Sequence, residues 1–217
     1  MIAIFFSLSQ EVASLKSQVN ILKKIRYANA VFYQAEFCGF PVTLVQTGVG
    51  KNVSEAIHQL STYLRIQLMV SSGFAGSVNP KVGVGDLVIG RRVLSSSRGV
   101  SEEGIPIDSA LPCDASAVDI AVALSSAGAL KFHCGDILSV DKIIRQSSLK
   151  THIGNQTSAI AVDMESFAIA ERANAMGIPF IAVRAISDGV DEDMEVGEDL
   201  VTRGGNVNIS APVRYLL

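Results

Sequence analysis

Two carboxylates and one arginine follow apolar runs that have the composition of buried parallel strands. Glu165 comes shortly after the run Ser158 to Val162, and Arg184 and Asp188 follow the run Phe180 to Val183. Because the ligand crevice of an open α/β sheet lies at the carboxyl ends of its strands, we expect these side chains to converge there. A pair of carboxylates suits cleavage of a glycosidic bond, in which positive charge develops on the sugar. The spacing alone equally allows structural roles, with Glu165 at a helix N-terminus and Asp188 in a loop turn.

The residues between these two runs have the pattern of a helix. The segment Glu165 to Met176 places Phe167 and Ile169 among small residues that can pack on a sheet. Gly177 and Pro179 then end the helix. The order is therefore strand, helix, strand, which favours an α/β fold.

A third carboxylate stands near the start of the chain. Ile2 to Phe6 is an apolar run that predicts a first strand, and Ser9 can cap a helix that begins near Gln10. Glu11 falls in the first turn of that helix, where the helix dipole alone would favour an acidic side chain.

Two glycine-containing segments follow predicted strands. Gly48 to Lys51 fits neither a phosphate-binding P-loop nor a dinucleotide fingerprint, because Val45 and Val53 stand where glycines are required. It is either a tight strand-to-helix turn or a glycine loop beside a ligand. Ser72 to Gly76 follows the predicted strand Leu68 to Ser71, and its two glycines allow close approach of the backbone to a ligand.

These segments together resemble one enzyme superfamily, that of the purine nucleoside phosphorylases and nucleosidases. The most similar branch is the methylthioadenosine/S-adenosylhomocysteine nucleosidases, and there is some resemblance to the hopanoid-associated nucleoside phosphorylases. The resemblance runs in the same order over roughly the first nine tenths of the chain. It rests on Glu11-Val12, Thr47 to Lys51, Ser72 to Gly76 with Val82 to Asp86 behind it, Val162 to Glu165, and Arg184 to Asp188.

The resemblance implies a fold and an assembly. We expect one domain over residues 1–217, with three α/β/α layers around a central, mostly parallel, twisted mixed sheet. It also implies a homo-oligomer, most simply a homodimer, that acts on a purine nucleoside.

The resemblance also implies roles for individual residues. Asp188 would protonate N7 of the departing purine, which requires that it hold a proton near pH 7 in a dry site. Glu11 would orient a water molecule or take its proton, and Arg184 would hold Glu11. Glu165 would accept hydrogen bonds from the ribose hydroxyls and stabilise the cationic sugar. Further residues of the expected binding site are Gly48, Ser72, Gly73, Phe74, Ile143, Ile144, Asp163 and Met164; for the two isoleucines, beside the base in this interpretation, plain core packing is the alternative.

Three functions remain open at this point: hydrolysis of the nucleoside, phosphorolysis, and nucleoside binding without turnover. A binder has no need of the acid and bases that Glu11, Glu165 and Asp188 provide together. Water is favoured over phosphate as the nucleophile, because Phe74 stands where many relatives have Ser or Thr. In addition, Leu68 to Val70 fill the stretch where related phosphorylases carry an arginine. The group on the ribose 5′ carbon stays open: methylthio, homocysteinyl or a larger apolar substituent such as a hopanoid.

Composition excludes several classes of protein. A net charge of −3 argues against a nucleic-acid surface, and no apolar run is long enough to span a bilayer. The 3 cysteines show no CxxC spacing, which favours a reduced, cytoplasmic protein. His58, His133 and His152 share no metal-ligand spacing, so we expect no metal and no cofactor, apart from phosphate as a co-substrate if the enzyme is a phosphorylase.

The remaining stretches are less informative. Asp114 to Ala127 predicts a helix capped by Asp114, and Phe132 to Val140 predicts a strand. Ser95 to Cys113 is rich in Ser, Gly and Pro and is either an active-site flap or a surface loop. Past Asp191 the resembled enzymes end in a long helix, whereas Gly204 to Asn208 intervenes here, so the chain is either cut short or belongs to a divergent branch.

Overall fold

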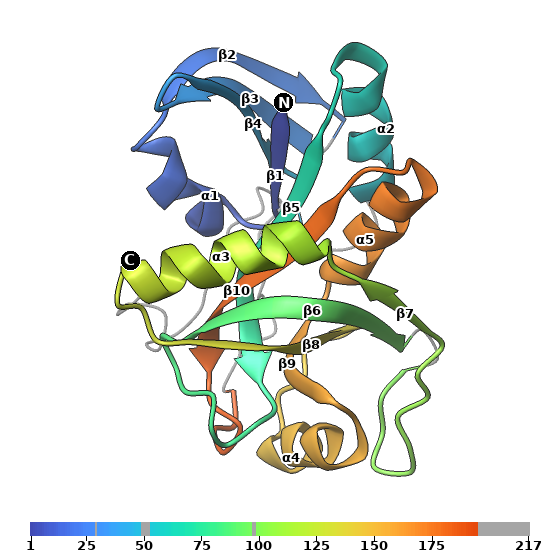
Figure 1. Ribbon diagram of the computed structural model, residues 1–217. Coiled ribbons are helices and arrows are strands. Elements are labelled where there is room, and N and C mark those ends of the chain that lie inside the picture. The colour runs from blue at the N-terminus through green and yellow to red at the C-terminus, as the bar shows by residue number, and fades with distance from the viewer. Residues whose placement is uncertain (29, 49–52, 97–98, 195–217) are drawn as a thin grey trace.

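A computed structural model describes residues 1–28, 30–48, 53–96 and 99–194 of the chain (Figure 1). The strands are β1 (Ile2–Phe6), β2 (Asn20–Tyr27), β3 (Ala30–Phe37), β4 (Phe40–Gln46), β5 (Leu68–Ser77), β6 (Leu87–Ser96), β7 (Ser109–Pro112), β8 (Phe132–Val140), β9 (Ala159–Asp163) and β10 (Phe180–Asp188). The helices are α1 (Ser9–Lys16), α2 (Val53–Tyr63), α3 (Ala115–Ala127), α4 (Ser147–Gln156) and α5 (Ser166–Ala175).

The described strands form one mixed sheet in the order β10-β6-β8-β9-β5-β1-β4-β3-β2, with β7 beside β6. Strands β1, β4, β5 and β10 pair in parallel, as do β6, β8 and β9. Antiparallel pairing occurs in the outer hairpins and where β10 meets β6 and β5 meets β9. Because β10 also pairs with β5, the strands β5, β10, β6, β8 and β9 close into a ring. The predicted α/β fold with a twisted mixed sheet is confirmed.

Apolar residues at helical spacing attach the helices to the sheet. In α2, the side chains of Val53, Ile57 and Leu60 are buried, and α2 lies beside α5 on one side of the sheet, with α1 on the other (Figure 1). Buried Ile169 and Ala173 of α5 belong to the same apolar cluster. Burial of this kind contributes about 1.5–3 kcal/mol for each large aliphatic side chain, so it fixes the helices against the strands that carry the site.

Several predicted elements need correction at their ends. Helix α1 begins at Ser9 itself, preceded by Leu8, and α5 begins at Ser166 rather than Glu165. The predicted loop Ser72 to Gly76 is part of strand β5, because β10 pairs with it almost to its end. The predicted helix α3, with the Asp114 side chain accepting from the Ala117 backbone N–H at 2.9 Å, and the strand β8 are confirmed.

The segment from Ser95 to Cys113 is partly regular. Its residues Ser109–Pro112 form β7 against β6, and Val100 and Ile105 pack on an apolar cluster around Leu138 and Ile153. None of its described residues lines the cavity reported below, so the flap interpretation has no support in this part of the chain. Predictions for Val49 to Asn52 and for the C-terminal stretch 195–217 fall outside the described residues.

Strand β2 was not foreseen, because its side chains are mostly exposed, three of its 8 residues are basic, and it contains no apolar run. It forms by pairing with β3, the first arm of the β3–β4 hairpin. Cys38 and Gly39 turn that hairpin with φ of 49° and 81°, the conformation that tight hairpin turns require. Among the described helices, none is long and apolar enough to cross a membrane.

Candidate active site

One cavity opens at the carboxyl ends of β1, β8, β9 and β10, beside the second half of β5. This is the edge of the sheet where the sequence predicted that the acidic side chains would meet. Its lining comprises Ser7, Leu8, Glu11, Phe74, Ala75, Gly76, Val140, Lys142, Ile143, Ile144, Val162, Asp163, Met164, Glu165, Ser187, Asp188 and Met194.

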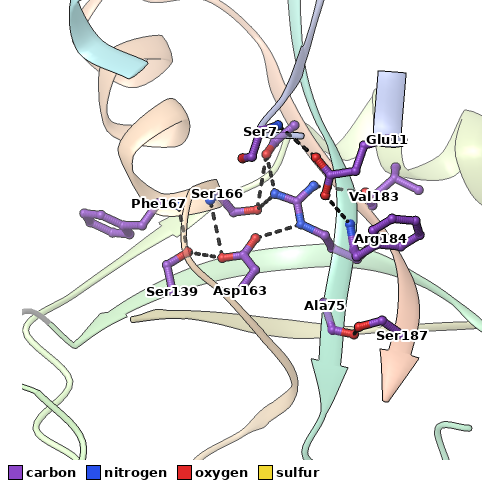
Figure 2. Close-up of polar contacts among 12 residues, drawn as sticks. Ser7, Glu11, Ala75, Ser139, Asp163, Ser166, Phe167, Val183, Arg184 and Ser187 are labelled. Atoms are coloured by element: carbon purple, nitrogen blue, oxygen red, sulfur yellow. Dashed lines mark hydrogen bonds and ion pairs between the residues drawn. The ribbon is translucent and has the colours of Figure 1, made fainter. Parts of the chain in front are cut away.

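Glu11 is held by backbone N–H groups. Its Oε2 accepts from Ser7 at 2.9 Å and from Leu8 at 2.8 Å, and its Oε1 accepts from the Phe74 N–H at 2.9 Å (Figure 2). Burial raises the pKa of the Glu11 carboxyl, while these three donors and the nearby charge of Arg184 act in the opposite direction. The carboxyl group is therefore fixed in position between β1 and β5, with part of its surface open to the cavity.

The two glycines of the Ser72 to Gly76 stretch make room for two carboxylates. A Cβ at Gly73 would overlap Glu11 Oε1 and come within 2.8 Å of Glu11 Cδ. A Cβ at Gly76 would lie 2.9 Å from Asp188 Oδ2, closer than real side chains approach. The sequence predicted that these glycines allow a ligand to approach the backbone closely. In the structure, the groups that approach them are the carboxylates of Glu11 and Asp188.

Arg184 is buried beneath the cavity and organises its floor. Its Nε donates to Asp163 Oδ2 at 2.8 Å, and its Nη2 donates to Ser71 Oγ at 2.6 Å and Ser166 Oγ at 2.8 Å. Figure 2 shows the guanidinium group pointing toward Asp163 and Ser166. The expectation that Arg184 holds Glu11 is therefore wrong, because its described hydrogen bonds go elsewhere and backbone donors hold Glu11. Arg184 affects Glu11 through its charge only.

Asp163 lines the cavity, but protein donors already occupy its carboxylate. Besides Arg184, it accepts from Ser139 Oγ at 2.5 Å and from the Ser166 backbone N–H at 3.4 Å (Figure 2). Its side chain is only 1 % exposed. Asp163 thus ties the end of β9 to the start of α5 and to β10, and it leaves little of its carboxylate for a ligand.

Glu165 directly precedes helix α5 and faces the cavity. The pKa of its carboxyl is raised from 4.5 to about 7, chiefly by burial and also by the negative charges of Asp163 and Glu11, while the charge of Arg184 opposes the shift. Glu165 makes no ion pair with any described residue. It is therefore a carboxyl group that exchanges its proton near neutral pH.

Asp188 ends strand β10 at an irregularity in the pairing with β5. A register shift between Ile186 and Asp188 brings Asp188 opposite Gly76, which is how bulges re-aim side chains next to binding sites. Its Oδ1 accepts from Ser187 Oγ at 2.6 Å, and its Oδ2 lies 2.6 Å from the Nζ atom of Lys150. Asp188 itself is 4 % exposed.

The remaining walls of the cavity are apolar. Phe74 and Met164 flank the carboxylates, and Ile143, Ile144 and Met194 close the other side. Of the predicted site residues, Gly48 and Ser72 are not part of this lining, and Arg184 and Gly73 lie behind it. Gly48 instead continues the turn after β4, where Thr47 Oγ1 donates to its carbonyl at 2.9 Å.

Sequence reasoning missed some residues of this site. Ser7 and Leu8 could have been inferred, because they directly follow the first strand, at the edge where ligands bind. Lys150 and Met194 carried no such signal, because a lysine in a polar stretch predicts an exposed helix face.

Comparisons with known proteins agree on one relationship. A family model described as "Phosphorylase superfamily" matches residues 1–211. The 5′-methylthioadenosine/S-adenosylhomocysteine nucleosidase of Buchnera aphidicola is 31% identical over 88% of this chain and 85% of its own length. The enzyme of the same name from Haemophilus influenzae is 32% identical over 88% of this chain and 86% of its own length. The S-adenosylhomocysteine nucleosidase of Streptococcus pyogenes, solved in complex with 5-methylthiotubericidin, superposes with a TM-score of 0.77 at 25% identity over 88% of this chain and 84% of that one.

Proposed function

Because the chain belongs to the phosphorylase superfamily, we propose that it is an enzyme that hydrolyses the N-glycosidic bond of an adenine nucleoside such as methylthioadenosine or S-adenosylhomocysteine. The relatives named nucleosidases cover most of the chain at about 30% identity, which supports this activity. The products are free adenine and a 5-substituted ribose.

The observation that carries the choice of water is the position of Glu11. A phosphate site needs several donors aimed at one anion. Here the backbone N–H groups of Ser7, Leu8 and Phe74 already point to the Glu11 carboxylate, which acts as an internal anion. A phosphate ion at this place would meet like charge, whereas a water molecule can donate to the carboxylate.

In the proposed reaction, Glu11 takes a proton from that water molecule as its oxygen attacks the anomeric carbon. The bond from this carbon to purine N9 breaks, its electron pair moves to the base, and Asp188 delivers a proton to N7. Asp188 suits this role because its carboxyl group lines the cavity at the carboxyl end of β10. Glu165, when ionised, stabilises the positive charge on the sugar and accepts hydrogen bonds from its hydroxyl groups.

Phosphorolysis is the less favoured alternative. Buried apolar Met69 belongs to the stretch Leu68 to Val70, in which related phosphorylases carry an arginine. Arg92, one of the few basic residues near the relevant loops, is paired with Asp136 at 2.5 Å and is not part of the cavity lining. Non-catalytic binding is disfavoured because three carboxylates, Glu11, Glu165 and Asp188, line one small cavity.

The test is to incubate the enzyme with methylthioadenosine in phosphate-free buffer made with H₂¹⁸O. We expect adenine release and one ¹⁸O atom in the recovered methylthioribose, with no change in rate when phosphate is added. Strict dependence on phosphate, with a ribose 1-phosphate as product, would contradict the proposal. The same assay over nucleosides with different 5′ substituents identifies the preferred one, since the apolar wall of Phe74, Met164 and Met194 suits a thioether.

We further propose that the enzyme needs no cofactor, works in the cytoplasm and forms a homodimer. The three cysteines are free thiols, which supports a reducing compartment. Large apolar side chains on α3 and just after it, Ile120, Leu124 and Leu130, are 61%, 68% and 53% exposed, and an apolar surface of this kind favours association. Light scattering at micromolar concentration should give about twice the 23.0 kDa mass of the chain.

A further inference from the structure

Lys150 is a fully buried lysine that the proposed reaction does not use. It lies on α4, its side chain is 0% exposed, and its Nζ atom is 2.6 Å from Asp188 Oδ2. A buried ammonium group without partners would cost several kcal/mol, so lysines are almost never fully buried unless they are paired. The position of this lysine therefore needs an explanation in terms of its partners.

The ammonium group has two hydrogen-bond acceptors and one ion-pair partner. Its Nζ donates to the carbonyl oxygen of Gly189 at 2.9 Å and to that of Glu192 at 2.8 Å, and it forms an ion pair with Asp188. These two carbonyl groups belong to the segment after β10 and fix the position of the nitrogen atom. Because the backbone holds the nitrogen atom there, its charge lies beside Asp188 Oδ2.

Asp188 is therefore bound through Oδ1 by a hydrogen bond and through Oδ2 by an ion pair. Ser187 Oγ donates to Oδ1 at 2.6 Å, Lys150 faces Oδ2, and the missing side chain of Gly76 leaves room for Oδ2 at that place. The other charged side chains of the same cavity, Glu11, Asp163, Glu165 and Lys142, make no described hydrogen bond to Asp188. Lys150 is thus the cation that sets the orientation of this carboxyl group.

The acidic residues of the site differ in whether a buried cation lies beside them. Arg184 compensates Asp163, and Lys150 compensates Asp188. Glu165, by contrast, has a pKa of about 7 and no such partner among the described residues. Removing Lys150 would therefore alter Asp188 first, while the contacts of Asp163 would stay in place.

We infer that Lys150 is the positioning residue for Asp188 in the cleavage reaction, an inference that rests on the proposed function. It does not touch the substrate and acts through the carboxyl group of Asp188. A proton donor must lie within hydrogen-bond reach of the atom it protonates, and a displacement of about 1 Å can cost on the order of 10²-fold in rate.

The test is a double-mutant cycle with Lys150→Met and Asp188→Asn, measured on an adenine nucleoside. We expect Lys150→Met to lower kcat by about 10–100-fold and to change KM by less than about 3-fold. In the Asp188→Asn background the same change should lower kcat by less than about 3-fold, because the group it positions is already inactive. A kcat of Lys150→Met within about 3-fold of wild type, or equal losses in both backgrounds, would overturn the inference.

Two controls separate positioning from damage to the fold. Lys131 Nζ lies 2.8 Å from Oδ2 of another buried aspartate, Asp86, and neither residue lines the cavity. Lys131→Met should therefore leave kcat unchanged. Binding of methylthiotubercidin, which has carbon in place of N7 and cannot accept the proton, should change by less than about 3-fold in Lys150→Met. If Lys150→Met does not fold, Lys150→Gln takes its place in the same cycle.

The melting temperature provides a readout that needs no turnover. Lys150→Met leaves a buried carboxylate unpaired, and Asp188→Asn leaves a buried ammonium group unpaired, so the double variant should lose less stability than the sum of the two single variants. An additive loss would overturn the pairing even in an active enzyme. If the wild-type protein releases no adenine but the melting temperatures are coupled, the proposed function fails while the Lys150–Asp188 pair stands.

Discussion

Gly73 of β5 and Glu11 of α1 are in such close contact that any side chain at position 73 would overlap the Glu11 carboxyl group. The carboxyl group lies there because the N–H of Phe74, the next residue in β5, donates to it at 2.9 Å. One residue of β5 thus supplies the space and its neighbour supplies the hydrogen bond. Position 73 therefore controls the placement of the proposed general base.

From this contact we predict that Gly73→Ala displaces Glu11 and lowers kcat by about 10²-fold or more, the usual contribution of a general base. The matched control is Gly104→Ala, because a Cβ at Gly104 meets nothing within 4 Å. Steady-state kinetics on methylthioadenosine measure both variants. Equal kcat values for the two variants would show that the position of Glu11 is not critical.

We predict that Asp188→Asn lowers kcat by about 10²–10⁴-fold, to a residual but measurable rate, and leaves nucleoside binding largely intact. The amide keeps a hydrogen-bond donor for the base, but it cannot deliver a proton, and acid catalysis contributes about 10²–10⁴-fold in rate. Single-turnover rates and calorimetric binding of methylthiotubercidin measure the two properties separately. More than about a third of the wild-type rate would exclude Asp188 as the acid.

The sequence predicted the main frame of this site because local patterns determine it. The apolar run of β8 and the Asp114 cap of α3 are local signals, and both were predicted with the correct limits. The positions of Glu165 and Asp188 follow from one rule, that the carboxyl ends of parallel strands face the ligand crevice, whereas Glu11 was assigned to the site by the family resemblance. Their presence in one cavity agrees with that rule.

Other features depend on contacts between distant segments, which local patterns do not contain. The hydrogen bonds of Arg184 join it to Asp163, Ser71 and Ser166, and its distance along the chain from Ser71 is 113 residues. Nothing near Arg184 in sequence distinguishes these partners from Glu11, which is why the predicted contact was wrong. In the same way, strand β2 forms through its pairing with β3, and the acceptors of the buried Lys150 are backbone carbonyl groups about 40 residues further along the chain.

The raised pKa of Glu165 predicts how stability depends on pH. The folded protein binds a proton at Glu165 between pH 4.5 and about 7 that the unfolded chain has released, so the free energy of unfolding falls as the pH rises through this range. Glu165→Gln removes this loss. We therefore expect its melting temperature to exceed that of the wild type at pH 8, by the equivalent of about 1–3 kcal/mol, and to match it at pH 5.

Calorimetry at the two pH values measures this difference. Glu171→Gln is the matched control, because Glu171 is an exposed glutamate on the helix that Glu165 precedes. Its melting temperature should follow that of the wild type at both values. A Glu165→Gln variant that is less stable than the wild type at pH 8 would show that ionisation of Glu165 does not destabilise the folded protein.

The last prediction concerns the buried pair of Arg184 and Asp163. Their side chains are 3% and 1% exposed, and removing one partner leaves the other as an uncompensated buried charge. Breaking such a pair costs about 3–5 kcal/mol, so Arg184→Met should lower the melting temperature by about 6–20 °C in a chain of this size. Adding Asp163→Asn to Arg184→Met removes the unpaired charge and should recover a measurable part of this loss, because the amide can still bond Ser139. Thermal unfolding of the two variants and the wild type measures these differences. If the double variant melts at a lower temperature than Arg184→Met, the two residues do not act as a pair. The other contacts of Asp163 would then be what stabilises the cavity floor.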